Sequence, residues 1–277
     1  MSYVTVGQEN SQPIEIYFED HGSGQPMVLI HGFPLNGHSW ERQETALLGA
    51  GYRVITYDRR GFGASSQPSS GYDYDTFTAD LDHLMKHLEL RDAVLVGFSM
   101  GSGEVARYLG KYGSERVSKA VLMSAIPPYL LQTPDNPEGV PQSVFDGIMD
   151  AIRKDRPSYH TAFLKDFYNV DVLGGTRVTD EAVRMSWNVA VGASATATLA
   201  CVPTWLTDFR DDVAKIKVPT LIVHGDADRI LPIEATGARL PKLIAGSEYV
   251  VIEGGPHAIG WTHYQEVNAA LLEFLAK

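Results

Sequence analysis

Short apolar runs bounded by glycine and proline recur along this chain, and longer amphipathic stretches separate them. Continuous apolar runs are typical of parallel strands buried on both faces, and such strands are joined by crossover helices. The pattern therefore predicts an α/β fold. Strands are expected at Ile14–Phe18 (within an N-terminal hairpin), Met27–His31, Arg53–Tyr57, Ala93–Gly97, Val117–Ser124, Thr220–His224 and Glu248–Ile252. Helices are expected between them at Trp40–Ala50, Thr76–Leu88, Gly101–Tyr112, Ile233–Leu243 and Tyr264–Lys277.

The alternation of strand and helix stops after Ser124 and resumes only at Thr220. The intervening sequence has helical spacing at Val144–Arg153, Tyr159–Phe167, Asp180–Ala190 and Trp205–Val213. Because the strands on either side belong to one sheet, we interpret residues 126–212 as a helical insertion in a single domain. Residues 1–125 and 213–277 then form the core.

Composition excludes several classes of protein and partner. The 277 residues are 44% hydrophobic and 21% charged, the balance of an ordinary globular protein. The formal charge of −11 disfavours nucleic acid and anionic membrane surfaces as partners. Cys201 is the single cysteine, so no internal disulfide is possible. The N-terminal residues lack the pattern of a secretory signal, and the apolar runs are too short to span a bilayer, so we expect a cytoplasmic location.

One pentapeptide combines a reactive residue with a suitable context. Gly97-Phe98-Ser99-Met100-Gly101 matches G-x-S-x-G and lies between a predicted strand and a predicted helix. In that context the pattern indicates a sharp turn that raises the Ser99 hydroxyl above the sheet, with glycines allowing close approach of the backbone. Serine is a weak nucleophile, so it needs a base within hydrogen-bond reach and an acid that orients the base.

Four later histidines are candidates for the base: His160, His224, His257 and His263. His257 is favoured because it follows a strand in the loop Glu253–Pro256, whereas the other three fall in the insertion, at the end of a buried strand and in the last predicted helix. Two carboxylates of the loop after Thr220–His224 are candidates for the acid. Asp228 is favoured over Asp226 because it lies farther from the strand, and we expect Asp226 to bond to local backbone N–H groups.

Acyl transfer also needs hydrogen-bond donors for the developing oxyanion. The backbone N–H of Met100, directly after the nucleophile, is one candidate. The other is the N–H of Phe33, in the loop His31-Gly32-Phe33-Pro34 that follows the first parallel strand. Pro34 has no N–H and cannot donate.

Two other patterns are present but incomplete. Residues 101–106 fit a dinucleotide-binding pattern, yet Val121–Ile126, where the ribose-binding carboxylate would fall, contain none. His83 and His87 have helical spacing, but the glutamate of a zinc-binding H-E-x-x-H sequence is missing. We therefore expect neither a dinucleotide nor a metal.

These segments together resemble α/β-hydrolases of the cofactor-free haloperoxidase, arylesterase and perhydrolase group. The segments that carry the resemblance are residues 31–34 with Trp40-Glu41, residues 57–65, 97–101 with Gly103-Glu104 and Arg107-Tyr108, 224–228 with Pro232, and 255–257. The resemblance implies a mostly parallel eight-stranded sheet with an inserted helical cap. It also implies Ser99, Asp228 and His257 as catalytic residues, Phe33 and Met100 as oxyanion donors, no cofactor, and self-association as trimers or dimers of trimers.

Within that group the likeness is closest to non-haem chloroperoxidases and to a bacterial γ-lactamase, through residues 135–142 and 205–210. The function expected is hydrolysis of small carboxylic esters through an acyl-enzyme, with peracid formation when hydrogen peroxide replaces water. Alternatives are a lactamase or amidase with the same residues and, from another class, a non-catalytic small-molecule receptor. The substrate pocket is expected to be lined by Pro34, Ile126, Phe163, Trp187, Trp205 and Phe209.

Overall fold

A computed structural model describes residues 2–277, and in this range eight strands form one sheet. The strands are β1 (Ser2–Glu9), β2 (Gln12–Gly22), β3 (Pro26–Ile30), β4 (Arg53–Tyr57), β5 (Ala93–Phe98), β6 (Val117–Met123), β7 (Thr220–Gly225) and β8 (Glu248–Ile252). Their order is β1-β2-β4-β3-β5-β6-β7-β8, with β1 and β2 antiparallel to their neighbours and the rest parallel. The predicted α/β-hydrolase fold with a mostly parallel sheet is confirmed.

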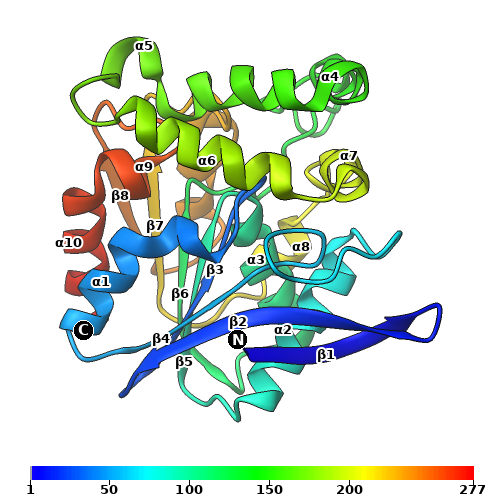
Figure 1. Ribbon diagram of the computed structural model, residues 1–277. Coiled ribbons are helices and arrows are strands. Elements are labelled where there is room, and N and C mark those ends of the chain that lie inside the picture. Colours follow the sequence, from blue (N-terminus) through cyan, green and yellow to red (C-terminus); the bar gives the residue numbers. More distant parts are fainter. Residues whose placement is uncertain (1) are drawn as a thin grey trace.

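Helices cover both faces of the sheet (Figure 1). One face packs on α2 (Tyr74–His87), α3 (Met100–Tyr112) and the short α8 (Arg210–Val213), and the other on α1 (Glu41–Gly49), α9 (Ile259–Thr262) and α10 (Tyr264–Leu275). The central strands are therefore buried on both sides, which explains why they are apolar throughout rather than alternating.

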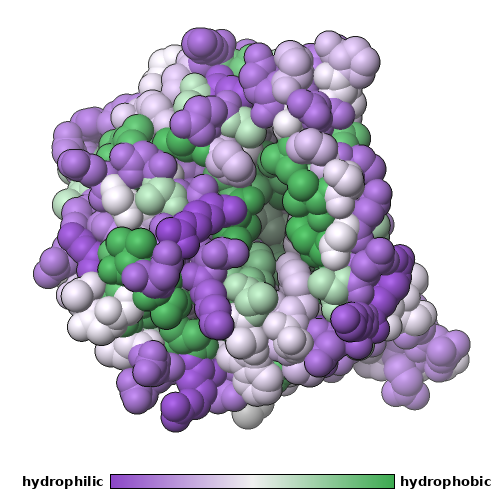
Figure 2. Space-filling view, turned by 90° about the horizontal axis from the view of Figure 1, so that it is seen from above, coloured by the Kyte–Doolittle hydropathy of each residue, from purple (hydrophilic) through white to green (hydrophobic). Residues whose placement is uncertain are grey.

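The insertion is helical, as predicted, and lies over the carboxyl ends of the strands (Figure 1). It consists of α4 (Gln142–Tyr168), α5 (Val170–Leu173), α6 (Asp180–Gly192) and α7 (Ala195–Thr204), which we call the cap. Helix α4 breaks at Asp155, whose side chain accepts a hydrogen bond from Ser158 N–H and starts the second half. The space-filling view of this side shows a hollow rimmed by hydrophobic side chains (Figure 2).

Two predicted helices differ from the structure, and one observed helix was not predicted. The helix expected at Ile233–Leu243 is two 3₁₀ turns, η2 (Ile233–Ala235) and η3 (Gly237–Lys242), because Thr236 has non-helical angles and Pro241 has no N–H. The helix expected at Trp205–Val213 is reduced to α8, which pairs with α3 of the core through Arg107 and Asp212. Helix α7 was not predicted at all.

No single helix within residues 2–277 is long and apolar enough to cross a membrane, although α6 and α7 together, bent by 96°, reach the required length and composition.

The parallel strands bring their carboxyl ends to one edge of the sheet. Ile30 pairs with Gly97, Phe98 with Met123, and Gly225 with Ile252. The loops that follow β3, β5, β7 and β8 therefore meet beneath the cap, and these four loops carry all the residues predicted for catalysis.

Candidate active site

Ser99 occupies the turn between β5 and α3 in a conformation that L-residues rarely adopt. Its backbone angles are φ 54° and ψ −120°, a strain of order 1–3 kcal/mol that the surrounding structure must hold in place. The turn needs glycine on both sides, because a Cβ at Gly97 would lie 2.4 Å from the Gly101 carbonyl oxygen and one at Gly101 would lie 2.2 Å from that of Ile30. The predicted strand–turn–helix context is confirmed.

A continuous chain of hydrogen bonds joins the three residues predicted for catalysis. Ser99 Oγ lies 2.8 Å from His257 Nε2, and His257 Nδ1 lies 2.7 Å from Asp228 Oδ2. All three side chains are buried. The His257 ring lies beside the rings of Phe98 and Phe167, and its backbone carbonyl accepts a hydrogen bond from Ser124 Oγ. These contacts fix the imidazole between the hydroxyl and the carboxylate.

Asp228 is held as a carboxylate. Its Oδ1 accepts hydrogen bonds from the N–H groups of Ile230 and Leu231, at 2.9 and 2.8 Å. Burial alone would raise the pKa of Asp228, but the charge of His257 and hydrogen bonds from His224 and His257 outweigh burial and hold that pKa well below its usual value. The group is therefore poised to orient the imidazole and to stabilise its protonated form.

His224 is a contact of Asp228 that the sequence did not reveal. Its Nδ1 accepts from Ala125 N–H, so its Nε2 carries the proton and lies 3.2 Å from Asp228 Oδ2. The prediction treated His224 only as a rejected candidate for the base. The available signal was its position four residues before Asp228 at the end of β7.

Asp226 bonds to a backbone N–H group, as predicted, but this group belongs to a neighbouring loop and not to its own. Asp226 is exposed, and its Oδ1 accepts a hydrogen bond of 2.7 Å from Gly254 N–H in the loop that carries His257. It thus ties the two loops together without touching His257 itself.

The N–H groups of Phe33 and Met100 are free to donate. Neither has a hydrogen-bond acceptor in the part of the chain that the structure describes, and both residues are buried. The Phe33 loop is anchored from below, because Arg59 donates to the His31 carbonyl at 2.8 Å and Arg59 N–H donates to His31 Nε2 at 2.9 Å. Arg59 is paired in turn with the fully buried Glu104.

Aromatic side chains of the cap surround Phe33. Its ring centroid lies 4.9 Å from that of Trp205, 6.0 Å from Phe163 and 6.3 Å from His160. Ile126 lies beside the nucleophile turn, since its N–H donates to Ser102 Oγ, which bonds to the Ser99 carbonyl. Pro34 is buried in the same loop as Phe33. Four of the six residues predicted to line a pocket are therefore placed around Ser99 or Phe33.

The other two predicted lining residues, Trp187 and Phe209, need correction. Trp187 donates from Nε1 to the Pro157 carbonyl and fills the space between α6 and α4. Phe209 is fully buried against Tyr74, with centroids 4.8 Å apart, and under the Arg107 guanidinium. Both are packing residues, and their aromatic character alone did not distinguish packing from pocket.

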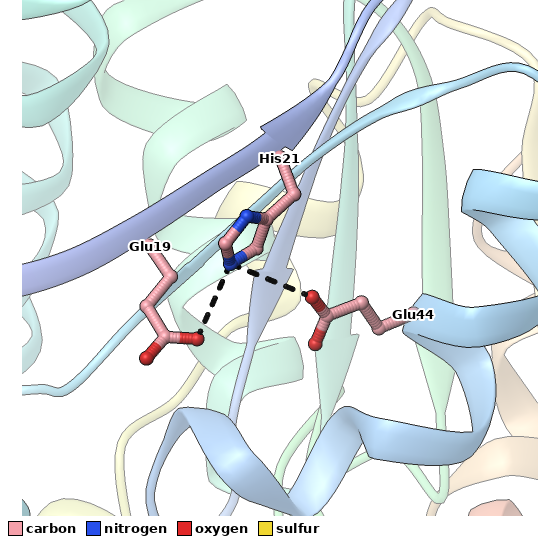
Figure 3. A group of neighbouring side chains, drawn as sticks. All are labelled: Glu19, His21 and Glu44. Atoms are coloured by element: carbon pink, nitrogen blue, oxygen red, sulfur yellow. Dashed lines mark ion pairs between the residues drawn. The ribbon is translucent and has the colours of Figure 1, made fainter.

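One side-chain group away from Ser99 has the chemistry of a metal site. Glu19 and His21 of β2 and Glu44 of α1 bring their ligand atoms within 4.8 Å of one another (Figure 3). His21 Nε2 lies 3.6 Å from Glu19 and 3.9 Å from Glu44, and the ring is half exposed. The group joins separate elements, so no spacing in the sequence indicated it, and ordinary ion pairing accounts for its geometry.

Comparison with known proteins places this geometry in a family. The family model described as "alpha/beta hydrolase fold" matches residues 25–264. The chain belongs to the alpha/beta hydrolase fold family. The match spans the sheet from β3 onward, the cap and the loops that carry Ser99, Asp228 and His257.

Within this family the chain is similar to named haloperoxidases and to an esterase. It is 72% identical to "Putative non-heme chloroperoxidase" of Synechocystis sp., over 99% of this chain and 100% of that protein. It is 34% identical to "Bifunctional esterase/perhydrolase DCH" of Acinetobacter calcoaceticus, over 99% of each chain. The crystal structure of bromoperoxidase from Bacillus anthracis superposes with a TM-score of 0.95 at 47% identity, covering 100% of this chain and 99% of that one. The resemblance to the non-haem haloperoxidase group is confirmed, and these relatives support an enzyme.

Proposed function

We propose that this alpha/beta hydrolase is a serine esterase and perhydrolase that acts on small carboxylic esters through an acyl-enzyme on Ser99. The observation that carries the proposal is the buried chain Ser99 Oγ, His257, Asp228, with hydrogen bonds of 2.8 and 2.7 Å. The names of the relatives, chloroperoxidase, bromoperoxidase and esterase/perhydrolase, agree with it.

In the acylation step Ser99 Oγ attacks the ester carbonyl carbon, and its proton passes to His257 Nε2. Asp228 fixes the tautomer that leaves Nε2 free to accept and stabilises the imidazolium that forms. The tetrahedral oxyanion accepts hydrogen bonds from the N–H groups of Phe33 and Met100. When it collapses, the carbon–oxygen bond of the ester breaks and the alcohol leaves with the proton from His257.

Deacylation decides the product. If water attacks the acyl-enzyme with His257 as base, a carboxylic acid is released. If hydrogen peroxide attacks, the product is a peracid, and a free acid can acylate Ser99 by the reverse of hydrolysis. A peracid and a halide ion with one proton give the carboxylic acid and a hypohalous acid, so halide oxidation follows in solution without a cofactor on the chain. We propose that the surroundings of the Pro34 carbonyl favour attack on the acyl-enzyme by hydrogen peroxide over attack by water.

The aromatic surroundings of Phe33 favour a small apolar acyl group. The rings of Trp205 and Phe163 pack against the Phe33 ring, and the N–H of Ile126 donates to Ser102 Oγ next to the nucleophile turn. We propose these residues, with Pro34, as the contacts that select the acyl group.

We further propose that the enzyme is cytoplasmic and that it self-associates. Light scattering of the purified protein would test the self-association.

Replacing the nucleophile tests the proposal. Ser99→Ala should lower both p-nitrophenyl acetate hydrolysis and acetate-dependent bromination by roughly 10⁴-fold or more. Ser247→Ala is a matched control, because the Ser247 hydroxyl has no hydrogen-bond partner within the described residues, and it should keep both activities. Survival of either activity in Ser99→Ala at the level of the control would exclude Ser99 from that reaction.

A further inference from the structure

Strand β6 carries none of the three residues of the proposed catalytic chain, yet a strained turn follows it in the middle of the site. The strand lies between β5, which leads to Ser99, and β7, which leads to Asp228 (Figure 1). Ser124, directly after β6, is fully buried and has a φ of 43°, in the left-handed region that residues other than glycine rarely adopt. Such strain persists only where the surrounding contacts hold the conformation, and it is often found at functional sites.

The turn at Ser124 redirects one backbone N–H group. In a regular strand, successive N–H groups point alternately toward the two neighbouring strands. The N–H of Ser124 donates to the Val223 carbonyl of β7 at 2.8 Å, so a regular continuation would point the N–H of Ala125 toward β5. The N–H of Ala125 donates instead to Nδ1 of His224, at the end of β7, at 3.2 Å. The left-handed conformation of Ser124 accounts for this change of side.

The Ser124 side chain bonds to the backbone of the base. Its Oγ–H donates to the His257 carbonyl at 3.0 Å. The His257 ring bonds to Ser99 on one side and to Asp228 on the other. A displacement of the His257 backbone would therefore lengthen at least one of these two hydrogen bonds, and the Ser124 hydroxyl opposes it.

The contact of Ala125 with His224 continues to the acid. His224 Nε2–H donates to the Leu231 carbonyl at 3.1 Å, and the Leu231 N–H donates to Asp228 Oδ1 at 2.8 Å. His224 is fully buried and is bonded through both ring nitrogens. It therefore sets the distance between Ala125 and the loop that carries Asp228.

The residues on either side of this pair reach the nucleophile. The N–H of Ile126 donates to Ser102 Oγ at 3.0 Å, and Ser102 Oγ–H donates to the Ser99 carbonyl at 2.5 Å. The Ser99 N–H donates to the Met123 carbonyl at 2.9 Å. The strained backbone of Ser99 is thus held at its N–H and at its carbonyl by residues of the turn after β6.

We propose that residues 123–126, which we call the β6 turn, position the three catalytic side chains relative to one another, and that Ser124 is the positioning residue for the base. The β6 turn is bonded to the backbone of Ser99 and of His257 and, through His224, to the loop of Asp228. The proposal rests on the acyl-enzyme function proposed above. It predicts that loss of the Ser124 hydroxyl lowers the rate of the chemical steps and leaves substrate binding unchanged.

Steady-state kinetics with p-nitrophenyl acetate tests this split. Ser124→Ala should lower kcat by about 3- to 10-fold, the effect of one lost hydrogen bond, and keep KM within about twofold. Ser118→Ala is the matched control, because Ser118 lies at the opposite end of β6 and its hydroxyl also donates to a backbone carbonyl, that of Asp92, at 2.8 Å. It should keep both constants. A kcat of Ser124→Ala equal to that of the control would overturn the proposal.

Ser124→Gly separates the hydroxyl from the strain. Glycine also lacks the hydroxyl but adopts a positive φ without steric cost. Ser124→Gly should therefore melt at a higher temperature than Ser124→Ala and yet have a kcat no higher than that variant. If kcat in Ser124→Gly returned to the value of the unmodified protein, the effect would belong to backbone strain, and the proposed role of the hydroxyl would be refuted.

Proton NMR of the protein without substrate gives a readout that does not depend on the acyl-enzyme. The His257 Nδ1–H, hydrogen-bonded to Asp228, should give a low-field resonance that is absent from His257→Gln. This resonance should move to higher field or broaden in Ser124→Ala, as a lengthened hydrogen bond requires, and stay in place in Ser118→Ala. An unchanged resonance in Ser124→Ala would contradict the positioning role. Full activity of Ser99→Ala, with the resonance still sensitive to Ser124, would count against the proposed function alone.

Discussion

At the scale of single residues, two carboxylates of one loop illustrate how position decides function. Asp228 is buried and touches His257 and His224, whereas Asp226 is exposed and touches the backbone of the neighbouring loop. Their positions after β7, together with the family resemblance, ranked them. Their environments now explain the ranking, because only Asp228 reaches the imidazole.

The two residues give a matched pair of variants. Asp228→Asn should lower kcat for ester hydrolysis by roughly 10³- to 10⁴-fold, because an amide at this position favours the wrong imidazole tautomer. Asp226→Asn loses only part of one loop contact and should keep kcat within about threefold, the effect of a weakened exposed hydrogen bond. Steady-state kinetics on both variants checks this. Equal losses in the two would show that loop structure, and not the contact with His257, governs the rate.

His160 is a second buried residue with a measurable signature. Neither ring nitrogen has a partner within the described residues, and burial, with a smaller effect of Arg156, lowers its pKa to about 4. In the unfolded chain the ring gains its proton near pH 6.5. The unfolded state therefore binds more protons between these values, and the free energy of unfolding decreases by up to about 1.4 kcal/mol for each unit by which the pH is lowered through this range. Above pH 6.5 this contribution to stability is fully present.

The variant His160→Leu removes that titration, so its free energy of unfolding should depend less on pH. Urea unfolding of both proteins at pH 4.5, 5.5 and 7.5 measures it, and the difference in free energy between them should grow in favour of the leucine variant as the pH falls. A difference independent of pH would mean that His160 is not held neutral in the folded protein.

At the scale of elements, the start of α3 depends on a close approach of two backbones. A Cβ at Gly101 would lie 2.2 Å from the Ile30 carbonyl oxygen, whereas one at Gly147 in α4 meets nothing within 4 Å. Gly101→Ala should thus destabilise the protein by about 2 kcal/mol or more. Gly147→Ala should stabilise it by about 0.5–1 kcal/mol through the lower flexibility of its unfolded state. Thermal unfolding compares them, and a similar melting temperature for both variants would contradict the close approach.

Elements with a strong local signal were predictable and those without one were not. The central strands were recognised because they are buried on both faces and read as apolar runs. Helix α7 was missed although Ser194 caps it, because its sequence ATATLACVPT is rich in threonine and includes Pro203. The 3₁₀ turns at 233–242 were taken for a helix because their apolar spacing is similar. The nucleophile turn and its partners were predictable since they lie in loops directly after strands. The cap residues that line the pocket were not predictable, because their positions depend on how helices far apart in sequence pack together.

At the scale of the whole molecule, the cap and the core are joined at several points. Ala258 N–H donates to the Phe167 carbonyl, Asn169 Nδ2 to that of Ala227, and Ser194 N–H to that of Gly61, at 3.0, 2.9 and 2.8 Å. The cap also buries the aromatic cluster around Phe33. We therefore expect residues 1–125 and 213–277 to unfold together with the cap as one domain.

Tryptophan fluorescence tests this cooperativity, because Trp187 and Trp205 lie in the insertion and Trp40 and Trp261 in the core. Fluorescence of the double variant Trp40→Phe/Trp261→Phe comes from the insertion alone. Fluorescence of Trp187→Phe/Trp205→Phe comes from the core alone. In each, unfolding by urea should give the same midpoint by fluorescence and by circular dichroism. A fluorescence transition of the cap at lower urea, ahead of the loss of secondary structure, would mean that it is a separate folding unit.

We propose that one acyl-enzyme on Ser99 carries both ester hydrolysis and peracid formation. The most direct measurement is rapid acid quenching during turnover of p-nitrophenyl butyrate, followed by peptide mapping by mass spectrometry. We predict a butyryl group on the peptide that contains Ser99, and its faster disappearance when hydrogen peroxide is added. Turnover with a butyryl group on another residue, or an intermediate that peroxide does not discharge, would contradict an acyl-enzyme on Ser99 shared by both reactions.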